Sequence, residues 1–264
     1  MVLRTSNLTK RFGGLTAVDD VNFELSEDEL CSLIGPNGAG KTTFFNLITG
    51  ELSPTEGTIE FKNQDKWVDI TDRPTYETAS MGIHRSYQIT NLFPTTTVLE
   101  NVRIAAQAHG PDSFNFWKNV GDFDRYYEEA HAILQRVGLD DKAEVITQNL
   151  SHGEKRQLEI AIALAGDPDV LLLDEPNAGV SSESVGMIID LINDVATDHA
   201  VLLVEHNMDI VMDVSDRIVV LHQGALISDG TPQEVRNDPD VQRAYLGGYE
   251  KGQGDEGGHQ EGVA

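Results

Sequence analysis

The alternation of apolar and polar residues predicts strands near the start of the chain. Val21, Phe23 and Leu25 alternate with polar residues, which is the period-two pattern of a half-buried strand. We therefore expect residues 2–30 to form short strands. A continuous apolar run follows at 30–34 and predicts a strand without a solvent-exposed face.

Two later apolar runs, 170–173 and 200–204, have the same character. Such runs suit strands that are buried on both faces of a largely parallel sheet. A helix is expected at 41–49 and a further strand at 57–61. From about residue 97 to residue 165 the pattern becomes helical and rich in Ala, Glu and Gln, which predicts a separate helical lobe. The chain is thus expected to be an α/β protein.

The net charge of the chain bears on which partners it can bind and in which salt concentration it is stable. The 264 residues include 44 acidic and 19 basic side chains, a formal net charge of −25. Nucleic acid is not expected as a partner, because phosphate contacts need clustered Lys and Arg. Such a charge self-repels unless salt shortens the Debye length, to about 3 Å at 1 M. We therefore predict a halophilic archaeal source; the alternative is an ordinary acidic soluble protein.

Neither a membrane span nor a disulfide is expected. No apolar stretch approaches the roughly 18 residues of a span, and the first residues lack the pattern of a signal peptide. We expect a cytoplasmic chain that reaches the membrane through a partner. The single cysteine, Cys31, lies in an apolar run and is interpreted as a buried small hydrophobe. The Gly-rich, polar residues 248–264 predict a disordered tail.

A phosphate-binding loop is predicted at residues 35–42, which match G-x-x-x-x-G-K-[ST] at every position. An expected strand precedes this phosphate loop and an expected helix follows it, so a simple Gly-rich turn is disfavoured. Backbone N–H groups and a helix N-terminus favour phosphate oxygens there. Lys41 is expected to reach the β- and γ-phosphates of ATP, and Thr42 to ligate Mg²⁺. The residues expected to bind ATP here are Gly35, Pro36, Asn37, Gly38, Ala39, Gly40, Lys41, Thr42 and Thr43.

Polar side chains also follow two of the predicted buried strands. Asp174 and Glu175 come after 170–173, and Glu205 and His206 come after 200–204. Open α/β sheets bind ligands at the carboxyl ends of their strands. We expect Asp174 to hold Mg²⁺ through water, Glu175 to orient and polarise the attacking water, and His206 to contact the γ-phosphate. A lone strand-end histidine is more often structural, but these groups converge on one crevice.

The segment 150–154, Leu-Ser-His-Gly-Glu, opens a predicted helix. Ser151 and Glu154 have the spacing of a capping box, which is a structural role. A capped helix N-terminus preceded by Gly is also an anion site, so both interpretations are compatible.

With these motifs in place, residues 3–247 resemble the ABC transporter ATPase family. Residues 150–154 are similar to its Leu-Ser-Gly-Gly-Gln signature, about twenty residues before the acidic strand end. By this resemblance, Gln88 matches the loop residue that senses Mg²⁺ and contacts the permease, and is expected at the nucleotide and the metal. His206 matches the switch histidine, and Phe12 matches the aromatic residue that stacks on adenine.

The resemblance implies a P-loop NTPase (RecA-like) core with a mainly parallel sheet, an N-terminal antiparallel β-subdomain and a helical subdomain. One cassette would cover 1–247, with its core at 1–90 and 160–247 and the helical lobe at about 91–159. The tail at 248–264 lies outside it.

The same resemblance implies the assembly. Two cassettes, identical or different, would pair head to tail, so that Ser151, Gly153 and Glu154 serve the partner's nucleotide. Permease subunits at the cytoplasmic face of the membrane and, indirectly, an extracellular solute-binding protein would complete the transporter.

A finer resemblance points to the branched-chain amino acid importers. It rests on segments such as 83–88, 97–102, 204–208 and the ending 230–247. Urea and amide importers and a lipopolysaccharide-export ATPase share much of this pattern. A soluble ABC ATPase and a non-enzymatic regulatory cassette are rivals of another class; the chain has one cassette and retains the catalytic motifs.

Two segments depart from the family pattern, the signature and the loop at 178–181, which reads Ala-Gly-Val-Ser where the family has Ser-Gly-Leu-Asp. His152 replaces the first signature glycine, and Glu154 replaces the signature glutamine. In the loop after the catalytic glutamate, Ser181 replaces an aspartate that couples the two ATP sites. We expect activity to survive the changes in the signature, whereas the change at Ser181 bears on coupling between sites.

Overall fold

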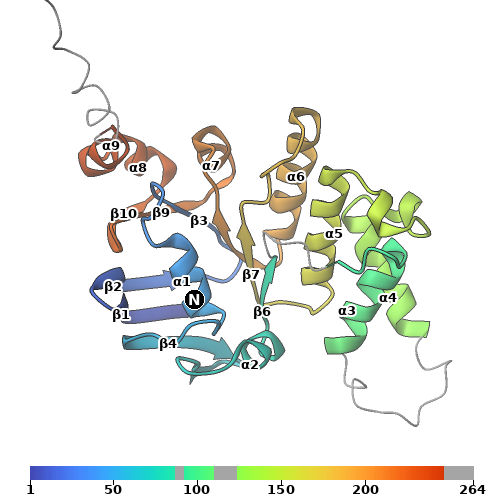
Figure 1. Ribbon diagram of the computed structural model, residues 1–264, viewed down its shortest axis with the longest axis horizontal. Helices are drawn as coiled ribbons and strands as arrows, with labels where there is room; N and C mark the ends of the chain where they lie inside the picture. Colours follow the sequence, from blue (N-terminus) through green and yellow to red (C-terminus); the bar gives the residue numbers. More distant parts are fainter. Residues whose placement is uncertain (87–91, 110–123, 247–264) are drawn as a thin grey trace, which may run out of the picture.

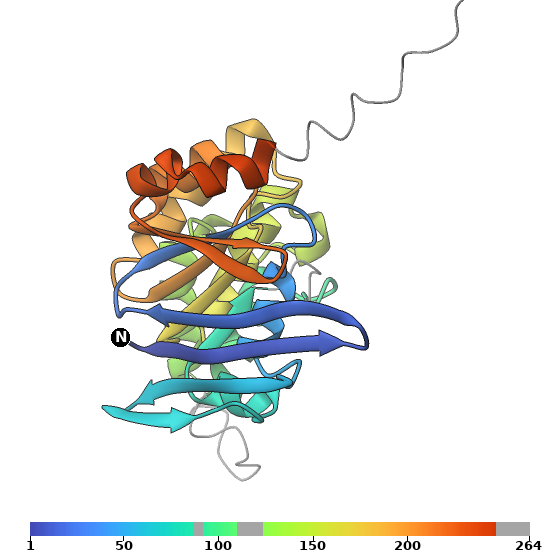
Figure 2. The same ribbon diagram turned by 90° about the vertical axis from the view of Figure 1, so that its left-hand side faces the viewer.

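A computed structural model describes residues 1–86, 92–109 and 124–246, and it contains two sheets (Figure 1). The first sheet is antiparallel. Figure 2 shows its strands side by side, in the order β2, β1, β4 and β5. These strands span Leu15–Leu25, Leu3–Phe12, Glu56–Asn63 and Lys66–Asp69.

The N-terminal strands are longer than the short strands expected from the sequence. β1 has 10 residues and β2 has 11. The alternation along β2 is confirmed, because Val21, Phe23 and Leu25 are buried and their polar neighbours are exposed. Polar residues at the bulges between the two strands, where the register shifts, obscure the alternation in β1.

The second sheet has six strands in the order β10, β9, β3, β8, β7 and β6. All neighbouring pairs are parallel except β9 and β10. The strands span Ala225–Gly230, Arg217–His222, Leu30–Ile34, Ala200–Val204, Val170–Asp174 and Ile83–Ser86. Every residue of β3, β7 and β8 is buried, which confirms the prediction from their continuous apolar runs.

Helix α1 (Lys41–Ile48) packs between the two sheets. Phe44 and Phe45 are buried in a cluster that joins Leu3 and Phe23 of the first sheet to Leu172 of the second. The other helices associated with the core are α2 (Thr75–Ser80), α6 (Ser182–Val195), α7 (Met208–Val214), α8 (Pro232–Asn237) and α9 (Pro239–Leu246). Helix α1, which follows the phosphate loop, is therefore held from both sides by apolar packing.

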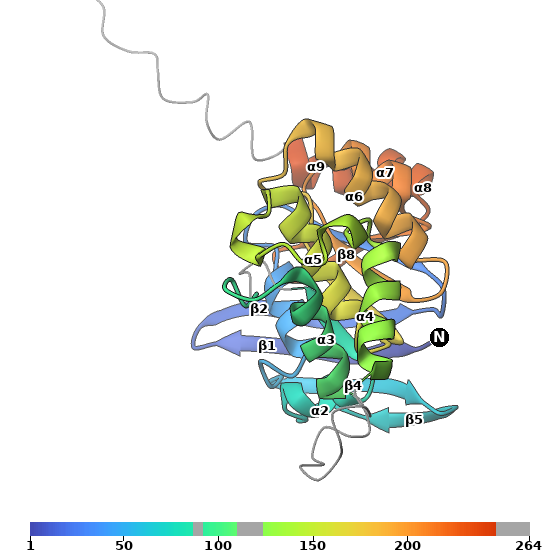
Figure 3. The same cartoon turned by 90° about the vertical axis from the view of Figure 1, so that its right-hand side faces the viewer.

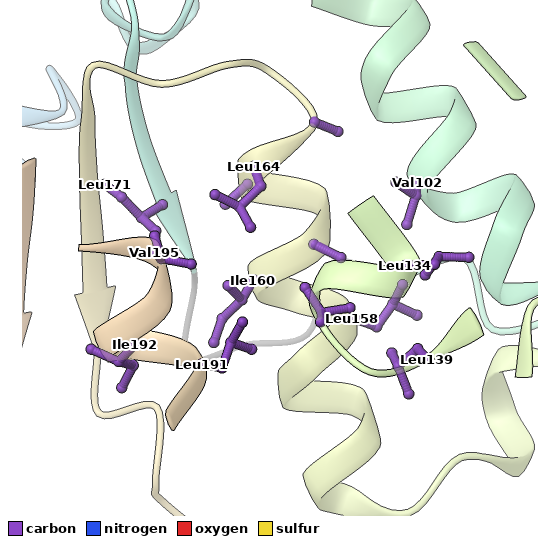
Figure 4. Close-up of a cluster of buried hydrophobic side chains, with 14 of the residues drawn as sticks. Val102, Leu134, Leu139, Leu158, Ile160, Leu164, Leu171, Leu191, Ile192 and Val195 are labelled. Carbon is purple, nitrogen blue, oxygen red and sulfur yellow. The ribbon is translucent and has the colours of Figure 1, made fainter. Parts of the chain in front are cut away.

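The helical lobe faces the viewer in Figure 3. It contains α3 (Val98–His109), α4 (Asp124–Arg136), two short 3₁₀ turns (Asp140–Lys142 and Thr147–Asn149) and α5 (His152–Leu164). Figure 4 shows Leu158 of α5 on the side of Leu134, and Ile160 and Leu164 on the side of Leu171. The expected lobe boundary at 159/160 therefore falls inside one continuous helix that packs against both parts.

Two other expectations concern Cys31 and membrane helices. Cys31 is fully buried, as predicted, and burial raises the pKa of its thiol. Along the described part of the chain, no helix combines the length and the apolar character that crossing a membrane requires. The predicted disordered tail, 248–264, lies outside the described residues.

Candidate functional site

The predicted phosphate loop and two of the predicted strand ends line one cleft. Leu33 and Asp174 both pair with Val204, which places the ends of β3, β7 and β8 at one edge of the parallel sheet. The cleft has a volume of about 630 Å³. Its lining residues are Phe12, Leu15, Thr16, Ala17, Asn37, Gly38, Ala39, Gly40, Lys41, Thr42, Thr43, Glu175, His206 and Gln223.

The phosphate loop is built to present backbone N–H groups. Gly40 precedes α1 with φ 111°, and a Cβ atom there would lie 2.3 Å from the carbonyl oxygen of Ala17. Only glycine fits this conformation and this close approach. The first turn of α1 has no side-chain cap and no acidic residue. Its N–H groups and the positive end of its dipole thus remain for an anion such as a phosphate.

Lys41 is folded over the same loop. Its Nζ donates to the carbonyl oxygen of Gly35 at 2.6 Å and to that of Pro36 at 3.3 Å. Burial lowers the pKa of Lys41, and the nearby carboxylates of Glu175 and Asp174 act in the opposite direction. A buried cation held by carbonyl oxygens suits a phosphate ligand, which would supply the missing negative charge.

Glu175 and His206 face each other in the cleft. His206 Nε2 lies 2.6 Å from Glu175 Oε1. Glu175 has φ 50°, the left-handed region, and its N–H donates to the carbonyl oxygen of Val204 at 2.8 Å. A non-glycine residue in that region costs about 1 to 3 kcal/mol. The two residues that sequence analysis assigned to catalysis at separate strand ends are thus brought together, one of them on a strained backbone.

Glu205 is a residue to which sequence analysis gave no role of its own. Its side chain is buried, and Oε1 accepts from both the backbone N–H and the Nδ2 of Asn177 at 3.1 Å. Oε2 accepts from the N–H of His206 at 3.2 Å. Glu205 therefore ties the segment after Glu175 to the segment that carries His206. A carboxylate directly after a fully apolar strand is the signal that could have identified it.

Sequence analysis included Arg85 only within the segment 83–88, yet its side chain lies at the edge of the site. Arg85 Nη2 donates to Asp174 Oδ2 at 2.6 Å, and Nη1 donates to Asn46 Oδ1 at 2.6 Å. Both ionic side chains are buried. The carboxylate that was assigned to Mg²⁺ is thus already paired with a cation. The local sequence, Ile-His-Arg-Ser, does not show that Arg85 is buried within a strand.

The donors fit Mg²⁺ only together with nucleotide phosphates. Among the described residues, no group of three or more His, Cys, Asp or Glu side chains is placed to hold a metal. Asp174 supplies one buried carboxylate, and Thr42 supplies a hydroxyl in the cleft. Mg²⁺ is commonly held by one or two carboxylates, substrate phosphates and waters, so this donor set is adequate. Gln88, the third predicted ligand, lies outside the described residues.

Phe12 ends β1 at the rim of the cleft and remains 46% exposed. Lys10 Nζ lies over the Phe12 ring, 5.2 Å from its centroid. An exposed aromatic face next to a phosphate loop suits a flat, apolar partner such as an adenine ring.

The signature segment lies apart from this cleft. Ser151 caps α5, and the predicted capping box with Glu154 is confirmed. The Glu154 carboxylate accepts from the Ser151 N–H at 2.7 Å and pairs with Lys142, which lowers the pKa of Glu154. Ser151, Gly153 and Glu154 are not among the described residues that line the cleft. The glutamate that replaces the signature glutamine is therefore neutralised within the chain.

The loop after Glu175 leads from the site to α6. Gly179 has φ 75°, and Ser181 precedes α6 with its Oγ 3.2 Å from the Oγ of Ser184. The Ser181 side chain thus makes a local contact at the helix start.

Two family models and several known proteins are similar to this chain. A family model described as ABC transporter matches residues 18–178, and one described as Branched-chain amino acid ATP-binding cassette transporter matches residues 225–251. The high-affinity branched-chain amino acid transport ATP-binding protein LivG of Escherichia coli K12 is 42% identical over 253 residues. This alignment covers 93% of this chain and 98% of LivG.

Solved structures of the same kind are similar in fold. The ADP conformation of an ATP-binding cassette of an ABC transporter has a TM-score of 0.79 and 30% identity, covering 93% of this chain and 98% of that chain. A dimeric, post-hydrolysis ATP-binding cassette with bound ADP and phosphate has a TM-score of 0.71 and 26% identity. It covers 87% of this chain and 98% of that chain.

Proposed function

This chain belongs to the ABC transporter family and is an ATPase, and on that premise we propose that it powers uptake of branched-chain amino acids through a membrane permease. Two features support the choice of solute. The relative LivG, a branched-chain amino acid transport ATP-binding protein, aligns along nearly the whole chain, and residues 225–251 match the corresponding family model. The observation that carries the catalytic part is the convergence of Lys41, Glu175 and His206 on one cleft.

The proposed reaction is in-line attack of water on the γ-phosphorus of ATP. The water oxygen forms the new P–O bond while the bond to the ADP bridging oxygen breaks. Glu175 holds the attacking water and accepts its proton, while Lys41 and His206 stabilise the charge on the phosphoryl oxygens. His206 Nε2 lies 2.6 Å from Glu175 Oε1, so both groups lie in the same part of the cleft.

Mg²⁺ is proposed as the metal, held by Asp174, Thr42 and Gln88. When bound, it supplies a positive charge that neutralises the β- and γ-phosphate oxygens. Phe12 is proposed to stack on adenine, and the backbone of the phosphate loop binds the phosphate chain.

We propose that a second cassette, identical or different, completes each site. Ser151, Gly153 and Glu154 would face the nucleotide bound by the partner's phosphate loop. The dimeric structure with ADP and phosphate, at 26% identity, supports this arrangement for a related cassette.

A groove of about 180 Å³ at the junction of core and lobe is the proposed permease contact. Residues on both sides of the 87–91 segment, Ser86 and Leu92, line it, and that segment contains Gln88. The full lining is Thr49, Thr75, Thr78, Ala79, Ile83, His84, Arg85, Ser86, Leu92, His109, Glu159, Ile162 and Ala163. The permease would hold the chain at the cytoplasmic face of the membrane, with an extracellular solute-binding protein on the other side.

A halophilic source is proposed from the net charge of −25. If this holds, the melting temperature rises steeply between low salt and multi-molar KCl, because screening removes repulsion among the carboxylates. A melting temperature independent of KCl would favour an ordinary acidic protein.

Uptake by cells tests the proposed solute. Cells that lack this chain are expected to lose high-affinity uptake of radiolabelled leucine, isoleucine and valine. The wild-type chain restores uptake and the Glu175→Gln chain does not. Loss of urea or amide uptake instead would assign the chain to that importer, and unchanged uptake of all these solutes would favour a soluble ABC ATPase.

A further inference from the structure

Arg85 of β6 lies where three elements of the nucleotide edge meet. Its guanidinium donates to Asp174 of β7 and to Asn46 of α1, each at 2.6 Å. Glu51 Oε1 lies 3.6 Å from Nη1, and the Phe45 ring centroid lies 5.4 Å from the guanidinium carbon. The Arg85 and Asp174 side chains are each only 7% exposed. One buried cation therefore links the carboxylate at the end of β7 to α1, the helix that follows the phosphate loop.

Two cations, the Arg85 guanidinium and a bound Mg²⁺, would interact with the same Asp174 carboxylate. A buried carboxylate without a partner is strongly unfavourable, so Arg85 stabilises Asp174 whenever the site lacks a metal. The same charge repels a divalent cation brought to that carboxylate, because the interaction is only weakly screened in a buried site. Arg85 thus favours a preformed site and at the same time opposes metal binding.

We propose that Arg85 is a positioning residue that sets the Mg²⁺ requirement of the site by competing for the Asp174 carboxylate. The proposal rests on the proposed role of Asp174 as a Mg²⁺ ligand. Its linkage to Asn46 means that the pair also fixes the distance between β7 and α1. A purely structural ion pair would influence stability alone, whereas a competing ion pair also changes the metal affinity.

Melting of the full chain at a fixed ATP concentration, titrated with free Mg²⁺, tests the proposal. Glu175→Gln is the background in every sample, so that ATP is not consumed. Arg85→Gln is expected to melt at a lower temperature without metal, and to need about tenfold less Mg²⁺ for half of its stabilisation. Arg85→Lys keeps the charge and is expected to keep the Mg²⁺ midpoint of the Glu175→Gln background within about twofold.

Two controls separate the possible effects. Arg136→Gln removes an ion pair between α4 and α6, where Arg136 Nε contacts Asp194 at 2.7 Å, and is expected to leave the Mg²⁺ midpoint unchanged. Combining Arg85→Gln with Asp174→Asn removes both charges, and is expected to recover part of the metal-free melting temperature lost in Arg85→Gln alone. Arg85→Met, whose stem keeps the contact with Phe45, replaces Arg85→Gln if that variant does not fold.

The outcomes distinguish this inference from the proposed function. If Mg²⁺ fails to stabilise the ATP-bound background, or if Asp174→Asn leaves that stabilisation unchanged, the assignment of Asp174 to the metal is wrong. If Mg²⁺ does stabilise it through Asp174 but the midpoint of Arg85→Gln equals that of the background, Arg85 is a structural ion pair and the inference is overturned.

Discussion

The nucleotide edge of the parallel sheet and the start of α5 are both proposed to contact ATP, but they are built in opposite ways. At the edge, polar groups from separate strands converge on a cleft, and carbonyl oxygens hold the buried Lys41 ammonium there. At the start of α5, Ser151 and Glu154 satisfy each other, and Lys142 neutralises the carboxylate. The edge is incomplete without a ligand, whereas the start of α5 is locally complete.

This difference explains how one chain can contribute to two sites. Because the hydrogen bonds at the start of α5 are satisfied within the chain, this segment keeps its geometry in the absence of the nucleotide that another molecule would bring. The edge instead holds the buried Lys41 ammonium on carbonyl oxygens, where a nucleotide phosphate would supply a compensating negative charge. Contacts at the edge are therefore expected to supply most of the free energy of ATP binding. The start of α5 is expected to make ATP hydrolysis depend on a second cassette.

The largest expected effect is at Glu175. Glu175→Gln should retain ATP binding and lower turnover roughly 10²- to 10⁴-fold, because the amide cannot accept the proton of the attacking water. ATPase assays and equilibrium binding of ATP measure the two quantities. Glu128→Gln, at an exposed position on α4, is the matched control and should change neither. Turnover at the wild-type rate in Glu175→Gln would mean that another group activates the water.

The next effect separates the start of α5 from the edge. Ser151→Asp keeps a good N-cap but places a negative charge where the partner's phosphates are proposed to lie. ATPase activity of the assembled transporter should fall about tenfold or more, while the melting temperature and ATP binding of the isolated chain stay near wild type. Ser151→Thr keeps the hydroxyl and should remain active. Equal loss of ATP binding in the isolated chain would contradict the separation of the two regions.

A smaller effect is expected at the contact between the two catalytic segments. In Glu205→Gln the NH2 group faces either the His206 N–H, with one hydrogen bond lost, or Asn177, with two lost. We expect about 1 to 3 kcal/mol lower stability and a several-fold lower turnover, with the KM for ATP little changed. Chemical denaturation and steady-state kinetics measure these. If Asn177→Ala in the same chain lowers turnover by an independent, multiplicative factor, the two residues do not act through a shared contact.

The smallest effect concerns the junction of core and lobe. His84 Nδ1 lies 2.8 Å from the carbonyl oxygen of Ala163 and Nε2 lies 3.0 Å from that of Ala79, and burial lowers the pKa of His84. Below pH 6.5 the unfolded chain binds a proton more readily than the folded one, so stability should fall as the pH drops toward the lowered value. His84→Gln should flatten that part of the stability profile in melts between pH 7 and pH 5. His131→Gln, at an exposed position on α4, should not.

What the sequence predicted well depended on continuous signals. The runs 30–34, 170–173 and 200–204, which became β3, β7 and β8, contain no charged residue, and the phosphate loop is a contiguous motif, so neither needs tertiary information. Asp174, Glu175 and His206 followed from the rule that parallel strands present their ends at one edge.

What the sequence did not predict depends on contacts between distant residues. β6 carries His84 and Arg85 in the sheet, and their burial is offset by Ala163 and Asp174, 79 and 89 residues away. The length of β1 was underestimated because Asn7 interrupts it with φ 49° and Thr5 is buried through a hydrogen bond to Val21. Polar residues can sit inside a strand when a partner strand supplies their hydrogen bonds, and no local pattern reveals that.

The most direct test of the central claim is to purify this chain by an affinity tag from detergent-solubilised membranes in high KCl and to identify what accompanies it by mass spectrometry. The account predicts recovery of multi-span permease subunits together with a second cassette, and an ATPase rate in that complex well above the rate of the isolated chain. Recovery of soluble proteins alone, from a preparation whose other transporters remain intact, would contradict the transporter assignment and leave a soluble ABC ATPase.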